Sequence, residues 1–435
     1  MPTRLIHLLA GALGAGVMAA GIALDRPAPP PPRPASAAMP RGPVTAIVNV
    51  RVFDGERVLP RATVVIDGDR IAGVGVDLAV PPGAGRVDGA GRTLLPGLID
   101  SHTHASDDAL ERALRFGVTT ELDMFADPAF AAKARAEQAK GPVTTRADLR
   151  SAGILVTAPG GHGTEFGMTI PTLAAAADAQ AFVDARIAEG SDYIKIVRDN
   201  GRIYGLTWPT LDDDELAAVV TAAHWRQKMA VVHIGSQADA VAAIRAGADG
   251  LVHLFEDSAP APDFAALAAS HHAFVIPTLT VLESVSGRPT GASLAADPRV
   301  APWLSESEAQ ALGAAFPLPS RSRGLALAHA NAAVAALEAA GVPLLAGTDA
   351  SNPGTTHGAS LHRELELLVA AGLTPVEALA AATSTPARVF GLRDRGRIAP
   401  GLRADLLLVA GDPTQDITAT RAIVAIWRNG AAVTR

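Results

Sequence analysis

Residues 94–104 are LLPGLIDSHTH, an apolar run that ends in Asp100 and two histidines, His102 and His104. The run predicts a buried β-strand. Side chains at positions i and i+2 of an extended segment point to the same side, so the two imidazoles face one way. Two such imidazoles can hold one metal ion. An H-x-H pair alone also arises by chance, so its meaning depends on what ends the other strands.

Seven more apolar runs follow this one, separated by helical patterns at 173–189, 212–228 and 237–246. The eight predicted strands span residues 94–99, 118–124, 150–156, 193–197, 229–233, 250–254, 274–278 and 343–348. Eight β/α units in a row predict an α/β fold of the (β/α)8 TIM-barrel type. A doubly wound sheet would need fewer strands, and no G-x-G-x-x-G follows any of them.

The two ends of the chain are predicted to be β-structure. Residues 43–92 contain alternating runs with an Asp-Gly-Asp turn at 67–69, and residues 396–435 contain two strands before the turn residues Asn429 and Gly430. We therefore expect a small β-sandwich built from both ends, around a hydrolase barrel at 93–395.

The first 42 residues have the pattern of an export segment. Arg4 precedes an apolar run at 5–24, and a Pro/Ala-rich linker follows at 27–40. This predicts a signal peptide, or an uncleaved membrane anchor, followed by an extended linker. Ala35-Ser36-Ala37 fits a cleavage site, so we expect the protein to be periplasmic or extracellular, or anchored by its N-terminus.

Composition excludes several kinds of chemistry. The 435 residues include no cysteine, which rules out disulfides, thiolate metal sites and cysteine nucleophiles. The formal net charge of −7 argues against nucleic acid as a partner. Only four of the 37 basic residues are lysines: Lys133, Lys140, Lys195 and Lys228.

The carboxyl ends of three later strands also carry metal-binding residue types. The strand at 229–233 ends at His233, the strand at 250–254 contains His253, and Asp349 follows the strand at 343–348. Barrel active sites form at the carboxyl ends of the strands, so these residues should meet His102 and His104. Four histidines and an aspartate at one end of a barrel predict a metal site.

Lys195 lies inside the predicted strand at 193–197, where burial of an ammonium is costly. The amine could extend to solvent. Alternatively, a buried lysine amine can lose its proton and add CO₂, and the resulting carbamate is an anionic ligand able to bridge two cations. Arginine cannot do this, and we favour the carbamate.

These residues resemble the amidohydrolase superfamily. The resemblance covers nearly all of residues 44–435, and its motifs are the segment 95–104, the lysine strand, the two single histidines, Gly347-Thr348-Asp349 and the segment 396–406. Gly160-Gly161-His162-Gly163 and His357-Gly358 favour the imidazolonepropionase-related and prolidase-like branch.

The resemblance implies a binuclear site, usually of zinc. His102, His104 and Asp349 would bind one metal, His233 and His253 the second, and carboxylated Lys195 and a hydroxide would bridge both. The expected reaction is hydrolysis of an amide or peptide-like C–N bond by the metal-bridged hydroxide. Asp349 would carry the proton to the leaving amine, and His162 would bind the carbonyl oxygen.

The substrate is less constrained. Arg198, Arg202 and Tyr204 follow the lysine strand and could clamp a substrate carboxylate, or form a solvated basic loop. His357 is a further candidate for substrate binding. The Ser-Gly-Gly type of stretch that prolidase-like relatives often carry near here is missing.

Two other classes of function stay open. A mononuclear deaminase or imidazolone-type hydrolase would keep the histidines and aspartate but typically lacks the bridging lysine. A non-catalytic barrel used for binding usually loses ligands, whereas every expected ligand is present. The expected partner is a small amide or peptide-like molecule, with membrane contact only through the N-terminus, and homo-oligomers are common in the superfamily.

Overall fold

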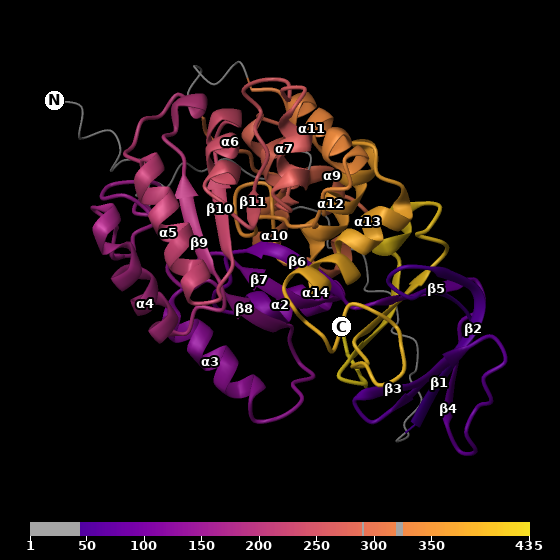
Figure 1. Ribbon diagram of the computed structural model, residues 1–435. Coiled ribbons are helices and arrows are strands. Elements are labelled where there is room, and N and C mark those ends of the chain that lie inside the picture. The colour runs from indigo at the N-terminus through magenta and orange to yellow at the C-terminus, as the bar shows by residue number, and fades with distance from the viewer. Residues whose placement is uncertain (1–43, 289–290, 319–324) are drawn as a thin grey trace, which may run out of the picture.

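The computed structural model describes residues 44–288, 291–318 and 325–435 (Figure 1). The predicted export segment at 1–42 lies outside these residues. In the described ranges, none of the helices has the length and apolar character needed to cross a membrane. The chain forms an α/β body of strands and surrounding helices, with a separate β-sheet beside it (Figure 1).

The α/β body is built on two parallel sheets. The first contains β6 (Leu98–Thr103), β7 (Val118–Asp123) and β8 (Asp148–Ser151). The second contains β9 (Ile194–Arg198), β10 (Ala230–Ile234), β11 (Gly250–Val252) and β12 (Phe274–Ile276). Nearly all residues of these strands are buried, which explains why they form continuous apolar runs rather than alternating patterns.

The two sheets are not joined into one continuous barrel in the described part of the chain. Isolated parallel bridges connect them: Val156 to Ile196, Val275 to Leu344 and Thr103 to Ala350. The predicted strand at 343–348 makes only the isolated bridge between Leu344 and Val275, with backbone hydrogen bonds to Val275 on one side and to Ser101 on the other. The architecture is therefore of the TIM-barrel class, but its eighth strand does not form a regular ladder.

Helices cover the outside of the two sheets (Figure 1). Those of the first half are α2 (Ala109–Arg115), α3 (Pro128–Gln138), α4 (Ala179–Glu189), α5 (Asp213–Trp225), α6 (Gln237–Arg245) and α7 (Phe264–Ser270). Those of the second half are α8 (Leu279–Val285), α9 (Gly291–Ala295), α10 (Glu306–Leu312), α11 (Leu327–Ala339), α12 (Ala359–Ala370), α13 (Pro375–Ala381) and α14 (Ser384–Val389). Asp212 and Glu215 form a capping box that starts α5.

Strands from both ends of the chain form one separate sheet, in the order β15-β14-β13-β5-β1-β2-β3, with β4 paired to β1. Its N-terminal strands are β1 (Val44–Phe53), β2 (Val58–Asp67), β3 (Arg70–Gly75), β4 (Gly85–Asp88) and β5 (Arg92–Pro96). Its C-terminal strands are β13 (Leu406–Ala410), β14 (Ile423–Arg428) and β15 (Ala431–Ala432). Asn429 and Gly430 both have positive φ, as their tight turn between β14 and β15 requires.

A buried ion cluster, formed by Asp148, Asp405, Arg395, Arg403 and Arg428, joins this sheet to the α/β body. Asp148 is the first residue of β8, so the cluster lies at the amino-terminal end of that strand. All three guanidinium groups contact Asp148, and two of them also contact Asp405. The cluster therefore ties the two parts of the molecule together at the end of the strands opposite to the histidines.

Candidate metal centre and active site

The five predicted imidazole and carboxylate ligands lie at or just beyond the carboxyl ends of their strands. His102 lies in β6 and His104 just after it, His233 lies in β10, His253 follows β11, and Asp349 follows the segment at 343–348. The Asp349 carboxylate lies 3.2 Å from Nε2 of His102 and 2.8 Å from Nε2 of His104. The predicted convergence at one end of the strands is therefore present.

Among the described residues, the tightest candidate metal cluster consists of His102, His253 and Asp349. One ligand atom from each lies within 4.8 Å of the others, and all three residues are buried. The ring of His233 lies 4.5 Å from that of His253, between centroids. The same cluster is thus extended by His233 on one side and by His104 on the other.

The histidines of the cluster are held neutral. Burial lowers the pKa of His102, His233 and His253 well below the ordinary value, and neighbouring positive charge adds to the effect. Burial by itself would raise the pKa of Asp349, but His102 and His104 hold it well below its usual range. Neutral imidazoles and an ionised carboxylate are the forms that bind metal ions.

Hydrogen bonds to the protein occupy one ring nitrogen on each of three histidines. Nδ1 of His104 is 3.2 Å from the Phe125 carbonyl oxygen, and Nδ1 of His253 is 2.7 Å from the Thr278 hydroxyl. Nε2 of His233 is 3.3 Å from Asp199. The opposite nitrogen of each ring is then available for a metal, an arrangement that fixes ligand orientation.

His102 differs from the other three. Both of its ring nitrogens are buried; Nε2 lies 3.2 Å from Asp349, and Nδ1 has no polar partner among the described residues. Buried polar atoms are normally satisfied, so Nδ1 calls for a partner that the described residues do not provide. A metal ion fits this need, and the neutral imidazoles and Asp349 around it form a suitable donor set.

The backbone around the cluster is strained at three residues and closely packed at Gly347. His253, Thr278 and Asp349 have φ values of 71°, 51° and 57°, in the left-handed region that non-glycine residues rarely adopt. Such strain concentrates at functional sites. A Cβ at Gly347 would lie 2.9 Å from the backbone nitrogen of His102, so the Gly-Thr-Asp motif requires glycine at its first position.

Asp100, the acidic residue before the histidine pair, has a supporting role. It accepts hydrogen bonds from the Thr348 hydroxyl, at 2.7 Å, and from the backbone N–H groups of Thr348 and His102. These contacts hold the first strand segment against the last one. They align His102 with Asp349, whose motifs are about 250 residues apart in the sequence.

Lys195 is 2% exposed and lies in β9, next to β10. It is paired with Val231, two residues before His233, so Lys195 and His233 point to the same face of the sheet. Burial lowers the pKa of Lys195 to about 7, although Asp349 and Asp123 oppose the shift. The amine is therefore available in its neutral, nucleophilic form near neutral pH.

His162 lies beside the cluster, on the glycine-rich loop after β8. Its ring is 4.9 Å from that of His233 and stacks on Trp208 at 5.1 Å, between centroids. Its Nδ1 is 2.5 Å from the Glu165 carboxylate. Burial disfavours the imidazolium, but the hydrogen bond and charge of Glu165 outweigh that effect and raise the pKa of His162.

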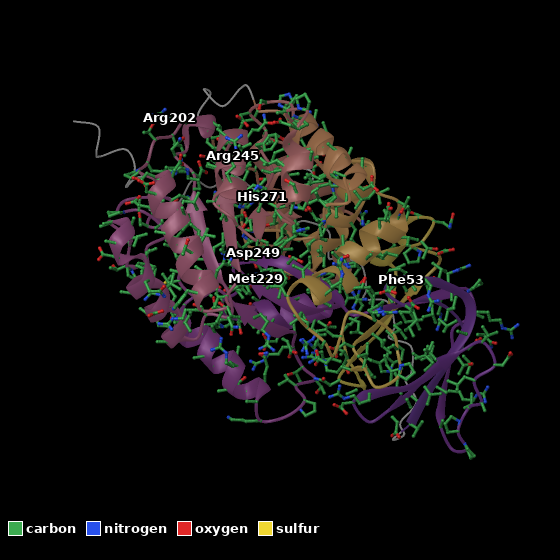
Figure 2. All side chains as sticks on the ribbon, viewed as in Figure 1. Phe53, Arg202, Met229, Arg245, Asp249 and His271 are labelled. Atoms are coloured by element: carbon green, nitrogen blue, oxygen red, sulfur yellow. The ribbon has the colours of Figure 1, made fainter. Side chains whose placement is uncertain are left out.

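The residues predicted to bind substrate have different surroundings. The Arg198 guanidinium contacts the Leu211 carbonyl oxygen and the carboxylates of Asp213 and Asp239. Arg202 is exposed, at the edge of the molecule in Figure 2, whereas Tyr204 is half-buried. His357 is completely buried, and its Nδ1 is 2.9 Å from the Glu121 carboxylate.

Several residues of the site were not predicted from the sequence. Thr278, Glu165 and Asp199 contact His253, His162 and His233 respectively. Glu256, three residues after His253, is also buried at this end of the strands. Asp199 directly follows the lysine strand, so its place at a strand end was a usable signal. Thr278 ends the predicted strand at 274–278 and carries the same signal, whereas Glu165 offers none.

A second hollow of the molecule is separate from these residues. A cavity of about 490 Å³ is lined by Met229, Asp249 and Phe274 among others. Met229 and Asp249 lie just before β10 and β11, at the end of the strands opposite to His233 and His253, and Figure 2 shows them well away from Arg202. The metal cluster and this cavity are therefore different places in the fold.

Residues 93–434 match the amidohydrolase family. The chain belongs to the amidohydrolase family. It is 31% identical over 416 residues to an imidazolonepropionase of Cereibacter sphaeroides, covering 88% of this chain and 96% of that one.

Among solved structures, the fold of this amidohydrolase is similar to a Xaa-Pro dipeptidase and to the ochratoxinase of A. niger. The dipeptidase has a TM-score of 0.72 at 21% identity, covering 90% of this chain and 100% of that one. The ochratoxinase has a TM-score of 0.69 at 21% identity, covering 89% and 95%. At this identity the likeness shows the fold alone. The expected resemblance to the amidohydrolases is confirmed.

Proposed function

We propose that this amidohydrolase hydrolyses an amide or peptide-like C–N bond of a small molecule, using two zinc ions. The observation that carries the proposal is the buried group of His102, His253 and Asp349, whose ligand atoms lie within 4.8 Å of one another. His102, His104 and Asp349 would hold one ion, and His233 and His253 the other, with a carbamate on Lys195 between them. When bound, the metals supply a water of lowered pKa and polarise the carbonyl.

Asp349 would transfer the proton, and His162 would hydrogen-bond the carbonyl oxygen. Asp349 is ionised and lies at the centre of the cluster, so its carboxylate can accept the proton of the attacking water. It can then pass that proton to the leaving nitrogen. His162 carries a raised pKa, so its imidazolium can donate a hydrogen bond to the carbonyl oxygen as negative charge develops there.

The carbamate on Lys195 is a separate part of the proposal. The neutral amine forms a bond from Nζ to the carbon of CO₂ and releases one proton, which leaves a carbamate anion. Support comes from the burial of Lys195, its low pKa, and its place on the same face as His233. An ammonium in the same position would repel both metal ions.

Metal analysis together with a substrate screen tests the proposal. We expect about two equivalents of zinc per chain in active protein, loss of activity on chelation, and recovery when zinc is returned. The screen should include acyl-amino acids, dipeptides, lactams and aryl amides. A fully active metal-free preparation, or zinc-loaded protein inactive on every amide class, would overturn it.

A second candidate is a mononuclear deaminase or a hydrolase of cyclic amides. The 31% identity to an imidazolonepropionase and the compact group of His102, His253 and Asp349 favour it. One metal per active chain, with either ammonia release or ring opening of a cyclic amide, would select this candidate. Two metals per chain would select the first.

We also propose that the protein is exported, because the segment at 1–42 has the charged start, apolar run and Pro/Ala linker of an export signal. Expression of the full chain followed by cell fractionation tests this. Mature protein outside the cytoplasm supports export with cleavage, and membrane-bound full-length protein supports an anchor. Full-length protein in the cytoplasm would contradict both.

A further inference from the structure

Glu256 is a buried carboxylate that has no hydrogen-bond donor within the described part of the chain. It is 1% exposed, and neither Oε1 nor Oε2 has a hydrogen-bond donor among the described residues. Glu256 lies three residues after His253, beyond the carboxyl end of β11. It therefore lies at the same end of the strands as the proposed metal ligands.

Other buried carboxylates of the α/β body have donors. Asp100 accepts hydrogen bonds from Thr348, and both oxygens of Glu364 accept hydrogen bonds at the start of α8. Asp148 is surrounded by three guanidinium groups. Buried polar groups are normally satisfied, so the isolation of both Glu256 oxygens indicates a missing donor.

The backbone holds Glu256 firmly in place. Its carbonyl oxygen accepts hydrogen bonds from the Ala326 amide, at 3.1 Å, and from Nδ1 of His329, at 2.9 Å. His329 belongs to α11, which packs against α7 and α8. The side chain is thus presented by a fixed segment, as a binding group should be.

The surroundings of Glu256 are acidic. The pKa of Tyr204 is raised well above its ordinary value, first by burial and then by the charges of Asp199, Glu256 and Asp349. The phenol of Tyr204 therefore connects Glu256 electrostatically to the metal cluster. Burial raises the pKa of Glu256 itself, and the charge of exposed Arg288 opposes that shift without a hydrogen bond to either carboxylate oxygen. Arg198 is engaged by Asp213 and Asp239.

We propose that Glu256 binds a protonated nitrogen, an ammonium group, on the amide substrate. This rests on the proposed function and specifies its substrate class as an amide that carries a cationic amine. With no cation beside it, much of Glu256 is protonated near neutral pH, because burial raises its pKa to about 8. An ammonium that enters favours the ionised carboxylate, a pure acceptor with two oxygens that faces a pure donor with three hydrogens. The same acidic surroundings disfavour a substrate carboxylate at this position.

Two matched ligand pairs test this proposal. Alaninamide and isobutyramide differ by an ammonium in place of a methyl group, as do the alanyl and isobutyryl p-nitroanilides. We expect calorimetry on the zinc-loaded protein to give about 10- to 100-fold tighter binding of alaninamide, the range of a hydrogen-bonded charge. Glu256→Gln should remove that preference and leave isobutyramide binding unchanged. Release of p-nitroaniline should follow the same order in kcat/KM.

A matched control is Glu338→Gln on the exposed face of α11, which should keep the wild-type preference. An unchanged thermal midpoint in Glu256→Gln shows that the fold is retained. Equal binding of the two amides by the wild type, or a preference that survives Glu256→Gln, would overturn the inference. Selective binding of alaninamide without hydrolysis of any amide would instead overturn the proposed function and leave the inference standing.

Discussion

Two groups of buried charges lie at opposite ends of the parallel strands, and they differ in how completely they are paired. In the ion cluster that joins the separate sheet to the α/β body, Asp148 contacts three arginines and Asp405 two of these. At the other end, by contrast, Nδ1 of His102 and both carboxylate oxygens of Glu256 lack a hydrogen-bond partner among the described residues.

The difference distinguishes the ion cluster around Asp148, which stabilises the fold, from the groups around His102, which are available to a ligand. The arginines hold the pKa of Asp148 below its usual range, against the opposing effect of burial, so this carboxylate stays ionised and bound. At the other end, burial holds the histidines neutral and lowers the pKa of Lys195 to about 7. Substitutions in the first group should change stability, and those in the second should change metal binding and activity.

The largest effect is expected at Asp349. Asp349→Asn removes the carboxylate that should move the proton, so kcat should fall by about 10²–10⁴-fold. Metal content should fall as well, whereas the thermal midpoint of the metal-free protein should hardly change. Asp214→Asn, on the exposed face of α5, is the matched control and should keep full activity. Wild-type kcat in Asp349→Asn would remove this residue from the chemistry.

A substitution of Arg428 tests the ion cluster at the opposite end of the strands. Its side chain is fully buried and contacts both Asp148 and Asp405, so Arg428→Met leaves two carboxylates with one cation fewer. The free energy of unfolding should fall by about 3–5 kcal/mol, as when one partner of a buried pair is removed. Urea unfolding at fixed pH measures the change. The protein that remains folded should keep its metal content and kcat. A loss of activity without a loss of stability would contradict the assignment of Arg428 to the fold.

Lys195 comes next, because it distinguishes a carbamate from an ordinary buried cation. Lys195→Arg keeps positive charge but cannot react with CO₂, so it should lose more activity than the 10–100-fold or so typical of groups that only support a metal ligand. Bicarbonate with a short carboxylic acid should restore part of the metal content and activity of Lys195→Ala. Lys228→Arg is the matched control. Full activity in Lys195→Arg would exclude the carbamate.

The sequence was sufficient to predict that the candidate ligands lie close together, because the strand ends of a barrel converge. His102, His233, His253 and Asp349 each lie at a predicted strand end, and one topological rule brings them together. The strand predicted at 343–348 is less regular than expected, because it makes only an isolated bridge to β12. The contact between His162 and Glu165 was not predictable in this way, because both residues lie on a loop whose conformation only the fold decides.

The pairing of charged residues could not be predicted from the sequence either. Arg428 lies 280 residues from Asp148, and both are among many arginines and aspartates of the same type in the chain. Arg198 follows the lysine strand and fits a substrate clamp by position, yet Asp213 and Asp239 engage it. Composition shows how many charges exist, but the packing decides which remain available.

Thr278 should have a smaller effect than the ligands, because it acts through His253. Thr278→Val removes the hydroxyl that meets Nδ1 of His253 at 2.7 Å and keeps the branched shape. Metal affinity should fall by about 10–100-fold, with kcat at saturating zinc reduced much less. Competition with a chromogenic chelator measures the affinity. Thr278→Ser retains a hydroxyl and should stay near wild type, and equal losses in both variants would point to packing instead.

The smallest effect, a shift rather than a loss, is expected at Glu165. Its carboxylate raises the pKa of His162 against the opposing effect of burial, so Glu165→Gln should lower that pKa. The imidazolium is present below its pKa, so activity that depends on it falls as pH rises through that value. The descending limb of kcat/KM against pH should therefore move to lower pH in Glu165→Gln and stay in place in Glu338→Gln. An unmoved limb would mean that His162 acts as a neutral group. Its pairing with Glu165 would then stabilise the fold, like the ion cluster around Asp148, and would not serve the reaction.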